Sequence, residues 1–94
     1  MRVVSRRRLR EFWEQHPQAE VPLAAWYKIA DKAVWKHLED VRSMYPSAEA
    51  VGEFTVFNIG GNDFRLVTRI VYLHHLVYVV EVLTHAEYNN RKWR

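Results

Sequence analysis

The 94-residue chain contains no cysteine, only three glycines and three prolines, and no long apolar run. Without cysteine, a disulfide scaffold, a thiolate zinc site and a cysteine nucleophile are all excluded. The apolar runs are only a few residues long, too short to cross a bilayer as a helix. No basic segment followed by an apolar segment opens the chain as a signal peptide would, so we expect a cytoplasmic protein with no membrane contact.

Several familiar chemical signatures are also missing. The sequence has neither a G-x-x-x-x-G-K-[ST] nor a G-x-G-x-x-G loop for nucleotide phosphates, and Gly60-Gly61 alone predicts a turn. No H-E-x-x-H pair occurs, and His74 and His75 are adjacent in a predicted turn, where their side chains diverge. The few serines lie in contexts that do not support Ser-His-Asp hydrolysis. We therefore expect no metal and no cofactor.

The composition predicts a folded chain with one domain. Apolar residues make up 49% of the sequence and aromatic residues 14%, more than a disordered chain carries. A length of 94 residues leaves no room for a second core, so residues 1–94 are expected to form a single domain.

Positive charge is concentrated at the two ends. Residues 1–16 hold five basic and two acidic side chains, and residues 85–94 hold three and one, giving +3 and +2. The middle, 17–84, has six basic and eight acidic groups, giving −2. Basic patches of this kind are typical of proteins that bind polyanions, and equally of solvated ends that keep a small protein soluble.

The first half of the sequence shows helical spacing. Residues 1–5 predict a short strand, because adjacent valines are β-branched. Apolar residues then recur three and four positions apart over 6–16, and again from Pro22 to about 34, which predicts two antiparallel amphipathic helices. The segment 35–46 is less regular and predicts one or two further helical turns.

Beyond Ala50 the apolar period changes to that of strands. Residues 54–59 predict a strand, and the turn at 60–63 has glycine to supply positive φ. Residues 64–72 and 76–84 predict two further strands of an antiparallel meander. The tail from 86 is polar and predicts either a short helix or a loose end.

This order of elements predicts an α+β protein with an N-terminal strand and two helices packed on one face of the meander. The apolar side of the 64–72 strand, beginning at Phe64, should face the helices. Arg65 and Arg69 then lie on the opposite, more open face, because a one-residue shift would bury both arginines. In the last strand, the same alternation places on one side Val77, Val79, Glu81, Leu83 and His85.

Polar and aromatic side chains gather where the last predicted strand ends. Cleaving RNA without a metal requires a base for the 2′-hydroxyl, an acid for the leaving 5′-oxygen and cations for the phosphorane, and an aromatic ring can hold a base. Histidine suits proton transfer near neutral pH, and arginine donates two parallel hydrogen bonds to phosphate. Candidates for these roles are His85, Glu87, Tyr88, Arg65, Arg69 and Lys92.

Each candidate also has a purely structural interpretation. A histidine at a strand end often serves only as a hydrogen-bonding group, and Arg65 could pair with Glu81 across the sheet. Trp93, among basic residues, could contact RNA or a partner, or pack back on the domain. Composition and spacing therefore leave open a non-catalytic basic module that binds nucleic acid or a protein partner.

Two motifs resemble a known family. The segment 56–66 reads V-F-N-I-G-G-N-D-F-R-L and resembles a signature of HigB toxins, a branch of the RelE-like toxin superfamily, with Asn62 as the turn residue. The segment 84–88, T-H-A-E-Y, resembles their closing T-H-A-E-Y-D motif. Shorter similarities follow the family's order over essentially the whole chain.

The resemblance implies the RelE-like microbial ribonuclease fold and the function of an mRNA interferase. Such a toxin enters the ribosomal A site and cuts the mRNA there without a metal, leaving a 2′,3′-cyclic phosphate. The implied partners are the ribosome, mRNA and a HigA-type antitoxin with a helix-turn-helix domain, and operator DNA is reached only through the antitoxin. Docking on ribosomal RNA would explain the basic ends.

Carrying the motifs over residue by residue gives candidate roles. Arg65 is expected to stabilise the phosphate, His85 to transfer a proton, Tyr88 to orient the ribose or stack a base, and Glu87 to orient a neighbour. Asn89 replaces the aspartate usual after the tyrosine, so this protein would depend more on Glu87 if that carboxylate takes part elsewhere. The residues expected to contact RNA are Asn58, Arg69, Arg91 and Lys92.

Overall fold

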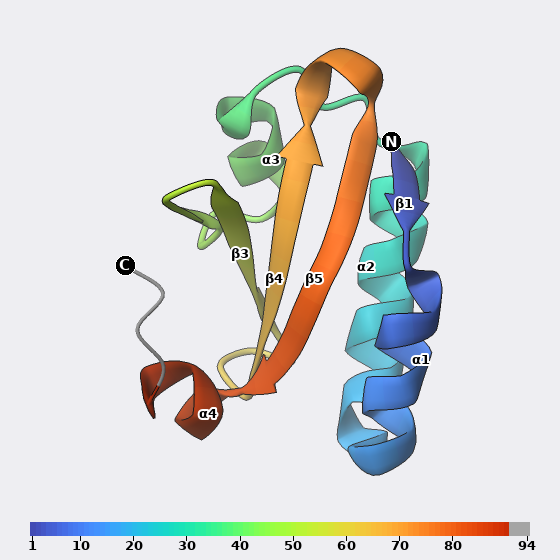
Figure 1. Cartoon of the computed structure of the whole chain (residues 1–94), viewed down its shortest axis with the longest axis vertical. Helices are drawn as coiled ribbons and strands as arrows, with labels where there is room; N and C mark the ends of the chain where they lie inside the picture. Colours follow the sequence, from blue (N-terminus) through green and yellow to red (C-terminus); the bar gives the residue numbers. More distant parts are fainter. Residues whose placement is uncertain (91–94) are drawn as a thin grey trace.

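The computed structural model describes residues 1–90 and shows a five-stranded sheet with helices against it (Figure 1). Its elements in chain order are β1 (Arg2–Val4), α1 (Arg6–Gln15), η1 (Pro17–Ala19), α2 (Glu20–Lys32), α3 (Leu38–Met44), β2 (Glu49–Val51), β3 (Phe54–Ile59), β4 (Phe64–Val71), η2 (Tyr72–His74), β5 (Leu76–Thr84) and α4 (His85–Asn90). The α+β class and the element order predicted from the sequence are confirmed.

The strands follow the spatial order β1-β5-β4-β3-β2. β3, β4 and β5 form the predicted antiparallel meander, whereas β1 pairs in parallel with β5, so the sheet is mixed. β2 was not predicted. It is only three residues long and pairs with the start of β3 across a turn in which Gly52 has φ of +59°.

The two long helices lie side by side and antiparallel (Figure 1). Leu9 of α1 and Trp26 of α2 are fully buried, as their helical spacing predicts. Pro22 lies in the first turn of α2, where its missing N–H has no helical acceptor to lose. No helix within residues 1–90 is both long enough and apolar enough to span a membrane.

The main core fills the space between these helices and one face of the sheet. Phe57 of β3 stands at its centre, in ring contact with Trp26, Trp35 and Tyr45. The side of β4 that begins at Phe64 faces this core, as predicted.

A bulge interrupts the alternation of β5. Val67 lies opposite Glu81, but Thr68 lies opposite Val79, so Val80 has no partner in the ladder. Because one extra residue reverses the faces, the prediction of one shared side for residues 77–85 is wrong. Val79 belongs to the main core, whereas Leu83 belongs to a second cluster on the other face.

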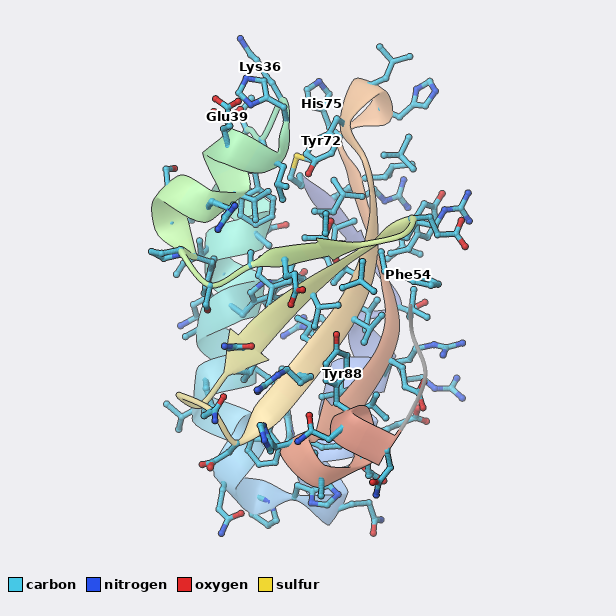
Figure 2. The ribbon with its side chains drawn as sticks, turned by 90° about the vertical axis from the view of Figure 1, so that its left-hand side faces the viewer. Lys36, Glu39, Phe54, Tyr72, His75 and Tyr88 are labelled. Carbon is cyan, nitrogen blue, oxygen red and sulfur yellow. The ribbon has the colours of Figure 1, made fainter. Side chains whose placement is uncertain are left out.

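That second cluster covers part of the face away from the helices. It consists of the buried residues Val51, Val56, Val67 and Leu83, with Phe54, Val80 and Tyr88 packed against them. Figure 2 shows the labelled Phe54 and Tyr88 on the side of the sheet opposite the helices. The face expected to be open is therefore partly covered, chiefly because α4 turns back onto it.

Candidate active site

Arg65 is the second residue of β4 and lies at the end of the sheet where the β3–β4 turn and α4 meet. Its cross-strand neighbours are Asn58 of β3 and Leu83 of β5. The prediction that Arg65 lies on an open face is wrong, since only 8% of its surface is exposed. The Tyr88 ring, brought there by α4, has its centroid 5.8 Å from the guanidinium carbon.

The guanidinium of Arg65 is held by the preceding turn and by the start of α4. Nη1 donates to the backbone oxygens of Asn62 and Phe64, each at 3.2 Å. Nη2 donates to Asn62 Oδ1 at 2.7 Å and to His85 Nδ1 at 2.8 Å. Two glycines with positive φ precede Asn62 and form the tight turn from which its amide reaches Arg65. Sequence reasoning assigned Asn62 only to the turn; its position three residues before the arginine was the available signal.

All of these hydrogen-bond acceptors are neutral. Among residues 1–90, no ion pair joins Arg65 to a carboxylate, and the strand register sets Glu81 opposite Val67 rather than opposite Arg65. A buried cation is normally paired, because leaving an isolated charge out of water costs several kcal/mol. The arrangement therefore has one unmatched positive charge at a place where an anion would be stabilised.

The contact with Arg65 determines which ring nitrogen of His85 carries the hydrogen. An arginine can only donate, so Nδ1 of His85 accepts and the ring hydrogen is on Nε2. Nδ2 of the Asn89 side-chain amide lies 2.9 Å from Nε2. Since two donors cannot pair, we assign the amide the flipped orientation, in which Oδ1 accepts from the Nε2–H of His85. Both ring nitrogens are thus engaged by neighbouring side chains.

Glu87 caps the helix that carries the histidine. Its Oε1 accepts from the Thr84 backbone N–H at 2.9 Å, and the Thr84 hydroxyl accepts from the Glu87 backbone N–H at 3.2 Å. This reciprocal pair is a capping box, and T-x-x-E just before a helix is its sequence signature. The expected role of Glu87 in orienting a neighbour thus has a concrete form: it fixes the first turn of α4, where His85 begins and Tyr88 follows.

The residues expected to contact RNA are divided in space. Asn58 lies directly across from Arg65 and is half-buried beside the site. Arg69 is four residues further along β4, with 58% of its side chain exposed and its Nε 3.9 Å from Glu53 Oε2, so it does not join the cluster. Arg91 and Lys92 lie outside the residues that the structure describes, as does Trp93.

Fold and site together define a small α+β protein with a buried arginine and a histidine in hydrogen-bonding contact at one end of its sheet. Residues 19–91 match the family model of HigB toxins, described as the RelE-like toxic component of a toxin-antitoxin system. The chain belongs to this family, which confirms the resemblance seen in its motifs and its RelE-like fold. Membership in a toxin-antitoxin system implies an antitoxin partner.

Curated relatives extend the similarity to nearly the full chain. The mRNA interferase toxin HigB of Escherichia coli K12 is 29% identical over 92 residues, covering 95% of this chain and 88% of that protein. The mRNA interferase HigB of Shigella flexneri has the same identity and coverage. The mRNA interferase HigB of Escherichia coli O6:H1 is 22% identical over 92 residues, or 95% of this chain and 89% of that protein.

Proposed function

We propose that this member of the HigB toxin family is an mRNA endoribonuclease that cleaves by attack of the ribose 2′-hydroxyl on the adjacent phosphate. The observation that carries the proposal is the buried Arg65 guanidinium, which is 2.8 Å from an imidazole and has no carboxylate partner among residues 1–90. A phosphodiester would supply the missing negative charge. The relatives named mRNA interferases support the same class of substrate.

Arg65 is the proposed electrostatic catalyst. When a phosphate enters, the Arg65 guanidinium redirects the N–H group that contacts His85 toward a phosphoryl oxygen. It thereby stabilises the charge that develops on the phosphorane. Asn62 keeps its hydrogen bonds to both terminal nitrogens, through its backbone oxygen to Nη1 and through Oδ1 to Nη2, so the charge stays positioned while the contact with His85 is exchanged for the phosphate. The substrate itself thereby frees Nδ1 of His85.

His85 is the proposed base. Once Arg65 no longer donates to Nδ1, that nitrogen has a free lone pair and accepts the 2′-hydroxyl proton. The Nε2–H group of the ring keeps its hydrogen bond to Asn89. The bond from the 2′-oxygen to phosphorus forms as the bond to the 5′-oxygen breaks. Water protonates the leaving 5′-oxygen, and the proton later lost from His85 neutralises the hydroxide that remains. The products are a 2′,3′-cyclic phosphate and a 5′-hydroxyl, and no metal enters this scheme.

Tyr88 and Asn58 complete the proposed site. The Tyr88 ring lies 5.8 Å from the Arg65 guanidinium carbon, packed against the second cluster, and offers a surface for the ribose or a base. Asn58 lies across the strand pair from Arg65 and is within reach of the same phosphate. Glu87 acts through helix α4, so we place it as a positioning residue.

The proposed setting is the ribosome, in the cytoplasm, where the toxin cuts mRNA during translation. The exposed arginines at the start of α1 give the surface that would dock on ribosomal RNA. The proposed antitoxin is of the HigA type with a helix-turn-helix domain, and through it the pair would reach operator DNA.

Inducible expression tests the proposal. The wild type should arrest growth and produce mRNA ends within reading frames that carry 2′,3′-cyclic phosphates. Arg65→Ala and His85→Ala should accumulate as folded protein and leave growth and mRNA intact. The matched control is Arg42→Ala, which removes an exposed arginine from α3 and should remain toxic.

Three results would decide against the account. Full toxicity in both site variants would remove the site, and cleavage of protein-free mRNA as fast as translated mRNA would remove the role of the ribosome. A wild type without toxicity or cleavage would favour a non-catalytic binding module.

A further inference from the structure

A second concave site lies at the opposite end of the strand pair that carries Arg65. We call it the Arg69 hollow, a cavity of about 430 Å³ lined by Arg69, Val71, His74, Leu76, Tyr78 and Val80. In Figure 2 the labelled His75, in the β4–β5 turn, and Tyr88, near Arg65, mark these two ends. The Arg69 hollow shares no lining residue with the cluster around His85.

The hollow faces the same side of the sheet as Arg65. Arg69 follows Arg65 at an even spacing along β4, which has no bulge of its own, and Tyr78 lies directly opposite Arg69 in β5. The spacing along the strand is about 13 Å, since a strand rises about 3.3 Å per residue. A single strand of RNA lying along β4 could therefore reach both arginines.

The lining has the chemistry that binds one nucleotide. Tyr78 is 38% exposed and lines the hollow together with the aliphatic side chains of Val71, Leu76 and Val80. Aromatic rings of this kind stack bases without regard to sequence, while a neighbouring arginine takes the phosphate. His74, exposed in η2, adds a ring with hydrogen-bonding nitrogens at the rim.

Arg69 already holds a weak anionic partner. Its Nε is 3.9 Å from Glu53 Oε2, and both side chains are more than half exposed, at 58% and 65%. Exposed pairs at this distance contribute little, so a phosphate could displace the carboxylate at small cost. The carboxylate marks the position where an anion meets this guanidinium.

We infer that the Arg69 hollow is a nucleotide-binding subsite for the RNA strand, away from the bond that is cut. Its base stacks on Tyr78 and its phosphate binds Arg69. This inference rests on the proposed function, which supplies the RNA, and it deepens that function by adding a contact that contributes affinity and not chemistry.

Equilibrium binding of the full chain to a fluorescein-labelled single-stranded RNA tests the subsite. The probe is a 12-nucleotide oligomer with 2′-O-methyl groups, which lacks the attacking hydroxyl and cannot be cleaved. Tyr78→Leu, which keeps apolar volume but removes the ring, should weaken binding roughly tenfold. Tyr78→Phe should bind within about twofold of the wild type, because the stacking face remains.

Arg69→Ala should weaken binding by a similar factor and also change its salt dependence. Losing one phosphate contact lowers the slope of log K against log salt by about 0.7 for a single strand, whereas Tyr78→Leu leaves the slope unchanged. The matched control, Arg42→Ala, removes an equal charge from α3 and should alter neither affinity nor slope by as much.

The outcomes separate the subsite from the proposed function. If Arg69→Ala and Tyr78→Leu bind the oligomer with wild-type affinity while mRNA cleavage is intact, the subsite alone is overturned. A protein partner would then be the favoured occupant of the hollow. An equal loss in Arg42→Ala would also overturn the subsite, because general charge would then explain the binding, and so would a wild type that does not bind the oligomer. Absence of mRNA cleavage by the wild-type protein would overturn the proposed function itself.

Discussion

Two arginines on one face of one strand have opposite surroundings. Arg65 is 8% exposed and held by neutral acceptors, whereas the side chain of Arg69 is 58% exposed and lies near a carboxylate. The difference comes from what covers each end of the strand. Helix α4 brings Tyr88 over Arg65, whereas the residues that line the hollow at Arg69 come from β4, β5 and the turn between them.

The comparison separates two uses of a cation. A buried guanidinium without an ion pair is costly, and proteins retain such groups mainly where function requires them. An exposed guanidinium costs little and attracts anions weakly and reversibly. This contrast supports the proposal that Arg65 receives the reacting phosphate and that Arg69 contributes only to binding.

The largest expected effect comes from Arg65→Met, which keeps side-chain length and removes the charge. Single-turnover cleavage of translated mRNA should fall by at least about 100-fold, because the phosphorane loses its cation. The free energy of unfolding should change by no more than about 1 kcal/mol, since removal of an isolated buried charge offsets the lost hydrogen bonds. Urea denaturation measures the second quantity.

Arg69→Met is the matched control for that experiment. It should alter stability by less than about 0.5 kcal/mol and leave the chemical step intact at saturating substrate. A loss of more than about 3 kcal/mol in Arg65→Met would reverse the interpretation, because Arg65 would then be a structural clamp.

A smaller effect is expected from the cap of α4. Glu87→Ala should lower stability by about 1 kcal/mol and reduce cleavage by loosening the helix that positions His85 and Tyr88. Glu87→Gln should keep most of the stability and most of the cleavage activity, because glutamine also completes a capping box. Amide hydrogen exchange in α4 and the cleavage rates of the two variants test this prediction. Equal inactivity of the two variants would show that the carboxylate itself takes part in the chemistry.

Asn89→Asp sharpens the assignment of His85. A carboxylate beside Nε2 favours the doubly protonated ring, so the base form is reached only at higher pH. The acid limb of the kcat/KM profile should move to higher pH and activity near neutrality should fall several-fold. Asn90→Asp adds the same charge one residue further along α4 and should leave the profile nearly unchanged. A profile unaffected by Asn89→Asp would argue against His85 as the base.

The smallest effect is expected at Glu53. Glu53→Gln removes the competing carboxylate from Arg69, so binding of the 2′-O-methyl oligomer should tighten by about twofold. Stability should stay within about 0.5 kcal/mol of the wild type. Weaker RNA binding in this variant would mean that Glu53 orients Arg69 for the strand rather than competing with it.

Much of the fold could be read from periodicity. The stripes of α1 and α2, the three strands of the meander and the Gly60-Gly61 turn are local patterns, and each is found where expected. β2 and the bulge at Val80 left no local signal, since a three-residue strand shows no alternation and the bulge contains no glycine. Both depend on pairing with residues distant in sequence.

The sequence indicated part of the candidate site, but not its environment. The motifs identified Arg65 and His85, which the structure brings within hydrogen-bonding distance. Strand alternation assigned Arg65 to the correct face but does not say what packs on that face. Tyr88, more than twenty residues later in the sequence, packs on that face. It lies on a helix whose capping box is formed by Thr84 and Glu87.

The most direct test follows the guanidinium of Arg65 by nitrogen-15 NMR as the non-cleavable 2′-O-methyl RNA is added to saturation. If Arg65 receives the phosphate, its Nη signals should shift and the Nδ1 signal of His85 should move as the hydrogen bond between them is released. Signals of both side chains that stay in place while the RNA is bound would contradict the account.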